Sequence, residues 1–228
     1  CDIEASGLIA PIAGHVGDGN FHVLMLLDPD DEAQWRESET INHNLVRRAI
    51  EADGTCTPFE PVPCDTFITE STFGLPIYRW PRQPELMADI NAWWQANAAQ
   101  GRPSVLFCYA FGKAQRILHN VDAGIGPLIV HGAVEPLNAV YRAAGVDLPP
   151  TLRVTDPGVD AQLLKTALVL APPSAQGTPW MKRFGAYADA FASGWMQLRG
   201  TRRRRGVDRG FVMSDHADWP GLQSAIAA

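Results

Sequence analysis

The chain has 228 residues, of which 46% are hydrophobic and 19% are charged, and its formal net charge is −6. This length can bury one large core or two smaller ones, and the charged fraction is too low for an extensively disordered chain. No apolar run approaches the roughly 18 residues of a membrane-spanning helix, and the first residues lack the basic-then-apolar order of a signal peptide. We therefore expect a folded cytoplasmic protein with no membrane partner.

Charge is distributed unevenly along the sequence. Residues 1–57 carry eleven acidic and three basic side chains, whereas residues 58–228 carry fourteen and sixteen. The change coincides with a proline-rich segment at residues 58–63, in which a helix cannot propagate. We therefore predict two domains, 1–57 and 58–228, joined at residues 56–60.

The first domain contains one clear strand pattern. Residues 21–27 form an apolar run of strand length. Asp30 or Asp31 then caps a helix that is predicted to extend to about residue 51. A loop, a strand and a helix make too small a unit for a core of its own, so this α+β fragment must pack on other structure.

Strand and helix patterns alternate in the second domain. Strands are predicted at residues 66–69, 104–109, 128–131, 166–171 and 210–213, and helices at residues 85–99, 112–119, 134–144 and 219–227. Short apolar strands separated by helices favour a mainly parallel sheet that is covered on both faces. The predicted fold class is therefore α/β, with a doubly wound sheet.

The first motif, His-Val-Gly-Asp-Gly-Asn-Phe-His, runs from His15 to His22. Its glycines permit a tight loop that turns two imidazoles toward one metal ion, and imidazole with carboxylate suits zinc, manganese or iron. The spacing alone is weak evidence for a metal and better suits a His15 that caps a turn and a His22 that is an ordinary strand residue.

With its flanking segments 6–8, 27–31 and 54–57, this motif resembles the C-terminal domain of FAD-linked oxidases, such as D-lactate dehydrogenase and the glycolate oxidase FAD subunit. The resemblance implies that His15 and His22 are metal or substrate contacts near the flavin. That family continues with a Gly-Glu-His-Gly segment that completes the metal site, whereas Pro58-Phe59-Glu60-Pro61 follows here. The FAD-binding domain is also missing, so we expect neither FAD nor oxidase activity from this chain alone.

The second motif set places one polar side chain after each of two predicted strands. Glu70 follows the strand at 66–69, and His216 follows the strand at 210–213. Functional groups commonly lie at strand carboxyl ends in α/β folds, where a Glu can orient a His that acts as a general acid. Each residue on its own better suits a cap of a turn or helix.

Four further segments, 75–81, 107–116, 130–134 and 191–196, extend this second set. Together they resemble the β-CASP branch of the metallo-β-lactamase nucleases, nearest to the ligase-associated DNA exonucleases and related to RNA 3′-end processing nucleases. The resemblance implies a β-CASP-like sheet, DNA or RNA as partner, association with a DNA ligase, and phosphodiester hydrolysis. It also implies that Glu70 and His216 are catalytic, with His216 as the acid for the leaving group.

The metal loop of those nucleases, which holds zinc or manganese, has no counterpart upstream of Glu70, and their last His ligand has none downstream of His216. We therefore expect a chimera, joined at residues 55–57, whose nuclease site is incomplete and does not fully bind metal. Two alternatives stay open: a fragment of an FAD-linked 2-hydroxy-acid oxidoreductase, and a non-catalytic nucleic-acid-binding fusion.

A basic run precedes the last strand. It comprises Arg199, Arg202, Arg203, Arg204 and Arg205. These side chains suit phosphate binding, and equally a solvated loop. Trp180, Tyr187 and Trp195 suit base stacking or core packing, while Lys113 and Arg116 suit a phosphate at a helix start or a surface face.

Overall fold

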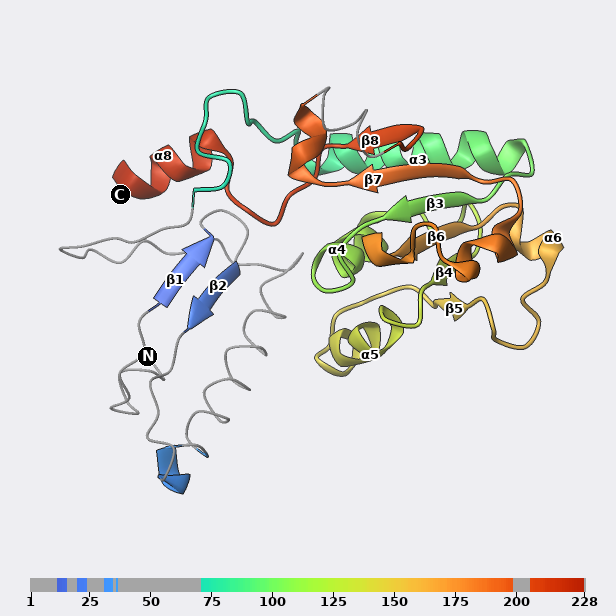
Figure 1. Ribbon diagram of the computed structural model, residues 1–228, viewed down its shortest axis with the longest axis horizontal. Coiled ribbons are helices and arrows are strands. Elements are labelled where there is room, and N and C mark those ends of the chain that lie inside the picture. Colours follow the sequence, from blue (N-terminus) through green and yellow to red (C-terminus); the bar gives the residue numbers. More distant parts are fainter. Residues whose placement is uncertain are drawn as a thin grey trace. The chain divides into compact units, whose positions relative to one another are not determined.

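The computed structural model describes residues 12–15, 20–23, 31–34, 36, 71–198 and 206–227. The chain divides into two compact units (Figure 1). One comprises Cys1–Pro76 with Asp215–Ala228, and the other comprises Ile77–Ser214. The boundary that we expect at residues 56–60 lies outside the described residues and stays a prediction.

The unit Ile77–Ser214 is built on a six-stranded sheet in the order β5-β4-β6-β3-β7-β8, and every neighbouring pair is parallel. The strands are β3 (Ser104–Phe107), β4 (Leu128–Val130), β5 (Leu152–Arg153), β6 (Leu168–Ala171), β7 (Ala188–Ala192) and β8 (Arg209–Phe211). The helices are α3 (Gln83–Ala99), α4 (Lys113–Asn120), α5 (Glu135–Ala143) and α6 (Ala161–Leu164), with 3-10 helices η1 (Pro173–Ala175), η2 (Pro179–Phe184) and η3 (Gly194–Gln197). The predicted α/β class is confirmed.

Both faces of this sheet are covered. On one face, Leu164 of α6 and Phe184 of η2 belong to the same buried cluster as Val105 and Val169 of the central strands. The alternate residues of those strands, among them Leu106, are also fully buried. A parallel sheet that is buried on both sides explains why β3 and β6 have continuous apolar sequences.

Most of the predicted elements of this unit are present. The strands expected at 104–109, 128–131, 166–171 and 210–213 correspond to β3, β4, β6 and β8, and three of the expected helices correspond to α3, α4 and α5. The strands β5 and β7 were missed. Alanine and aspartate have weak strand preferences, so the Ala-Asp-Ala-Phe-Ala sequence of β7 gives no strand pattern, but its alanines are buried between β3 and β8.

The other unit contains a two-stranded antiparallel sheet, made by β1 (Ile12–His15) and β2 (Asn20–Val23), and the helix α8 (Trp219–Ala227). The sequence predicts a loop where β1 lies. The predicted cap at Asp31 is confirmed, because its carboxylate accepts hydrogen bonds from the backbone N–H groups of Ala33 and Gln34 at 2.9 and 3.1 Å. The expected strand at 66–69 and most of the expected helix that follows Asp31 lie outside the described residues.

Candidate functional site

The hairpin of β1 and β2 fixes the relative positions of His15 and His22. Ala13 pairs with His22, and His15 pairs with Asn20. Directly opposed positions of an antiparallel pair share a face, and so do positions two residues apart on one strand. The register therefore puts residues 15 and 22 on the same face of the hairpin as diagonal neighbours.

His216 follows β8 after four intervening residues and lies among residues of its own unit. Its Nδ1 is 3.3 Å from Oδ1 of Asp215, and the two side chains are 24% and 31% exposed. The ring of the buried Phe73 meets the His216 ring edge to face at 5.7 Å. Glu70, which stands three residues before Phe73, lies outside the described residues. The structure thus brings the segment after Glu70 to His216 and leaves the expected Glu70–His216 pair untested.

The basic side chains at the start of α4 serve the fold. Lys113 is only 3% exposed, and its Nζ lies 5.0 Å from the centre of the Tyr109 ring. The Arg116 guanidinium donates to Oε1 of Gln83 at 2.7 Å and to the carbonyl oxygen of Ser214 at 2.9 Å. The surface-face interpretation is therefore wrong for Lys113, and Arg116 ties α4 to the start of α3 and to the segment that follows β8.

Cys108 is buried in the core, close enough to Lys113 to feel its positive charge. Its burial raises its pKa to about 12, although the charge of Lys113 acts in the opposite direction. The residue is therefore an inert thiol at neutral pH, because the reactive thiolate is not populated.

Three large aromatic side chains remain exposed at the carboxyl edge of the sheet. Tyr109 and Phe111, which follow β3, are 58% and 59% exposed, and Trp195, which follows β7, is 41% exposed. β3 and β7 are paired in parallel, so both sets lie at the same edge. This is the edge at which doubly wound sheets bind ligands.

The other aromatic candidates pack on the protein itself. Trp180 and Tyr187 lie against the buried cluster of the sheet. The Trp180 ring meets Phe184 and His131 edge to face at 4.7 and 4.8 Å. Core packing is thus the better interpretation for Trp180 and Tyr187, whereas Trp195, whose ring meets that of Tyr78 edge to face at 6.0 Å, is 41% exposed.

Most of the remaining expectations, on metal ions and on the basic run, concern residues that the structure does not describe. Within the described residues, no three His, Cys, Asp or Glu side chains converge in a way that could hold a metal ion. Arg199 and the arginines at 202–205 lie outside the described residues. Among the described helices, none is both long and apolar enough to cross a bilayer.

Comparison with known proteins separates the two parts of the sequence. Residues 2–58 match the C-terminal domain of FAD-linked oxidases. A mitochondrial D-lactate dehydrogenase (cytochrome) of Arabidopsis thaliana is 46% identical over 56 residues, and a probable mitochondrial D-lactate dehydrogenase of Danio rerio is 48% identical over 56 residues. These alignments cover 25% of this chain and only 10% and 11% of the two dehydrogenases.

A further similarity extends over more of the chain at lower identity. A protein named probable DNA ligase, from Opitutus terrae, is 28% identical over 183 residues, which are 80% of this chain and 17% of that protein. An alignment of this length cannot fit within the first 58 residues, so most of it falls on the remainder. The chain thus spans less than a fifth of the length of each of these relatives.

The match to FAD-linked oxidases agrees with the resemblance that we inferred for residues 1–57. This match links residues 2–58 with enzymes that use FAD, so it speaks against our expectation that FAD plays no part. The β-CASP resemblance of residues 58–228 is supported only at the level of an α/β fold with a parallel sheet, and none of these matches supports zinc or manganese.

Sequence reasoning missed a pair of carboxylates beside the edge strand. The register Ala190↔Arg209 brings Asp189 of β7 next to Asp208, whose backbone N–H donates to the Asp189 carboxylate at 2.8 Å. Burial raises the pKa of Asp189 above its ordinary value of 3.8; this hydrogen bond acts against the rise, and the charge of Asp208 adds to it. Neither residue carries a motif, because the pair exists only through strand register.

We expect Asp189→Asn to stabilise the protein at neutral pH. A carboxyl group whose folded pKa is raised favours the folded state below pH 3.8, and that contribution is lost as the pH rises through the raised pKa. Asparagine keeps the oxygen that accepts from Asp208 and removes the charge. Urea denaturation at pH 7 and at acidic pH should show a higher midpoint for the variant only at pH 7, and an equal difference at both pH values would contradict the assignment.

Proposed function

We propose that residues 2–58 serve as the substrate side of an FAD-linked 2-hydroxy-acid oxidoreductase of the D-lactate dehydrogenase kind. In such enzymes the flavin carries the redox chemistry. The contribution of this segment would be to hold a divalent metal ion, which would supply Lewis-acid chemistry toward the substrate. His15 and His22 are the proposed ligands.

The hairpin register is the observation that carries this proposal. Two imidazoles at diagonal positions on one face can reach a common ion. Imidazole is a good ligand for zinc, while manganese would need additional oxygen ligands. The identity of 46% to 48% with two D-lactate dehydrogenases over this segment supports the 2-hydroxy-acid class. Since two ligands make a weak site, we expect further ligands from outside this hairpin.

Calorimetric titration of the purified protein with Mn²⁺ or Zn²⁺ tests the proposal. We expect saturable binding that weakens about tenfold or more in His15→Ala and in His22→Ala. His119→Ala is the matched control, because His119 lies in the other unit and its Nδ1 is 2.8 Å from the carbonyl oxygen of Asp147. Equal metal affinity in all four proteins would refute the metal site, and visible absorbance of the purified protein reports flavin separately.

We propose a second function for the unit Ile77–Ser214, namely binding of DNA, with RNA as the alternative. The similarity to a probable DNA ligase over 80% of the chain supports it, and so do Tyr109, Phe111 and Trp195 at one edge of the sheet. Exposed aromatic rings are the common stacking surface for single strands. In this proposal residues 58–228, which include this unit, derive from a ligase-associated β-CASP nuclease, and Glu70 and His216 of the other unit are its catalytic remnants.

Fluorescence anisotropy with a labelled oligothymidylate tests this second proposal. We expect affinity that falls with salt and that drops about tenfold both in Trp195→Ala and in a variant with serine at positions 202–205. Arg153→Ser is the control, because Arg153 forms an ion pair with Asp156 on the surface. Absence of binding at low salt would refute the proposal.

A cleavage assay on the same oligonucleotide, supplemented with zinc or manganese, examines hydrolysis. We expect no cleavage, since the metal ligands of the nuclease family are missing from this sequence. Cleavage that disappears in His216→Ala would show instead that a working site is assembled.

A further inference from the structure

The sheet ends at β8, and the outer edge of this strand carries backbone groups that point away from β7. The backbone N–H of Ser193 donates to the carbonyl oxygen of Phe211 at 3.1 Å, so the polar groups of Phe211 face β7. Because these directions alternate along a strand, the N–H and C=O groups of Gly210 and Val212 face outward. No strand among the described residues pairs with this edge.

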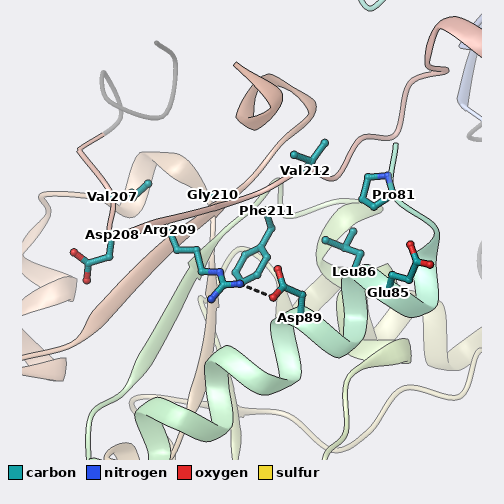
Figure 2. A pocket seen from close by; sticks show the side chains of 10 residues that line it. All are labelled: Pro81, Glu85, Leu86, Asp89, Val207, Asp208, Arg209, Gly210, Phe211 and Val212. Carbon is teal, nitrogen blue, oxygen red and sulfur yellow. Dashed lines mark hydrogen bonds and ion pairs between the residues drawn. The ribbon is translucent and has the colours of Figure 1, made fainter. Parts of the chain in front are cut away.

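A cavity of about 520 Å³ lies along the same edge, between β8 and the first half of α3. Its lining combines apolar side chains, among them Leu86 of α3 and Phe211 of β8, with charged ones. Figure 2 shows Arg209 and Phe211 pointing from β8 toward α3, with Arg209 bound to Asp89. An extended segment that paired with β8 would insert every second side chain into this cavity.

The charges of the cavity favour a basic occupant. Three of its four charged residues are acidic, namely Glu85, Asp89 and Asp208. Asp89 is neutralised by Arg209, while Glu85 and Asp208 lie at opposite ends of the cavity in Figure 2. Glu85 forms an ion pair with Arg82, whose side chain is 83% exposed. Exposed ion pairs of this kind contribute little free energy, so Glu85 can exchange Arg82 for a basic side chain of the occupant at small cost.

Asp208 has a further reason to attract a cation. The Asp208 carboxylate lies beside that of Asp189, on which the positive charge of Arg102 also acts. Two neighbouring carboxylates repel each other, and a positive charge placed next to them removes part of that cost.

We propose that the edge of β8 binds an extended segment of a partner protein, which adds as a seventh strand and places Lys or Arg side chains beside Asp208 and Glu85. Side chains four residues apart on an added strand lie on one face and span about 13 Å. A basic, apolar, basic pattern at alternate positions therefore directs two basic side chains toward Asp208 and Glu85 and one apolar side chain toward Phe211. This inference is independent of both proposed functions, since it uses neither the histidines nor the aromatic edge.

The probe is a capped, fluorescein-labelled peptide, Thr-Lys-Thr-Val-Thr-Lys-Thr, measured by anisotropy with the whole protein. We expect saturable binding, and about tenfold weaker binding of the same peptide with Glu in place of both Lys residues. Failure of the Lys peptide to bind, or equal binding of the two peptides, would overturn the proposal.

Variants of the protein test separately the backbone pairing at the β8 edge and the charges of the cavity. Val212→Pro removes an outward N–H and leaves the hydrogen bonds to β7 in place, so we expect about tenfold weaker binding, whereas Val212→Ala should change it less than threefold. The double variant Glu85→Gln, Asp208→Asn should abolish the preference for Lys over Glu and does not depend on folding of the proline variant. Preference unchanged in the double variant would overturn the assignment, as would sedimentation showing that a second copy of this chain already occupies the edge.

Discussion

Trp94→Ala should destabilise the unit Ile77–Ser214 by about 3–5 kcal/mol, the range for truncating a large buried aromatic side chain. Trp94 of α3 is fully buried, and its indole N–H donates to the carbonyl oxygen of Thr166 at 2.8 Å. Alanine leaves a cavity against the sheet and also leaves that carbonyl oxygen without its donor. The measurement is the free energy of unfolding from hydrogen exchange at the β3 and β6 amides across a urea series.

Trp94→Phe serves as the comparison for this change. Phenylalanine keeps most of the buried ring but has no N–H group, so we expect a loss of about 1–3 kcal/mol. If the two variants were equally destabilised, the lost hydrogen bond and not the lost volume would be the main cause. A loss below about 1 kcal/mol in Trp94→Ala would show that this packing is not essential.

Gly126→Ala should destabilise the same unit by about 3 kcal/mol, at the upper end of the cost of overpacking. A Cβ atom on Gly126 would lie 2.4 Å from the carbonyl oxygen of Thr166 and 3.4 Å from the Trp94 ring. The first contact is with backbone two residues before β6, which cannot move without disturbing the pairing of β6 with β3 and β4. The same exchange measurement applies.

Gly132→Ala is the matched control, because a Cβ atom there meets nothing within 4 Å and its backbone is not left-handed. We expect its free energy of unfolding to change by less than about 0.5 kcal/mol. Equal destabilisation at the two glycines would mean that the contact with Thr166 does not set the outcome.

The sequence predicted the elements whose identity depends on local pattern. β3, β4 and β6 are short apolar runs between helices, and α3 and α5 begin and end near turn-forming residues, so periodicity and length were sufficient. The formation of β7 depends instead on its neighbouring strands. Its small side chains fit between β3 and β8, but their local strand preference is too weak to predict a strand. The hairpin strand β1 was missed because its glycine and histidine suggested a loop.

The candidate sites divide in the same way. His15, His22 and His216 stand out by residue type and spacing. Their partners follow from register and packing, as with Phe73 against His216 and Ala13 opposite His22. The burial of Lys113 and the Asp189–Asp208 pair were beyond sequence reasoning, because each arises from tertiary contacts between segments that are distant along the chain or between adjacent strands.

The strand order has a consequence for how this protein is made. β3 is the first strand of the sheet to be synthesised, and its two neighbours, β6 and β7, come late: Ser104 pairs with Leu168 and with Ala188. During translation both edges of β3 therefore stay unpaired until most of the sheet has left the ribosome. Such late closure slows folding and exposes an aggregation-prone segment, so a nascent chain of this topology is a natural client for chaperones.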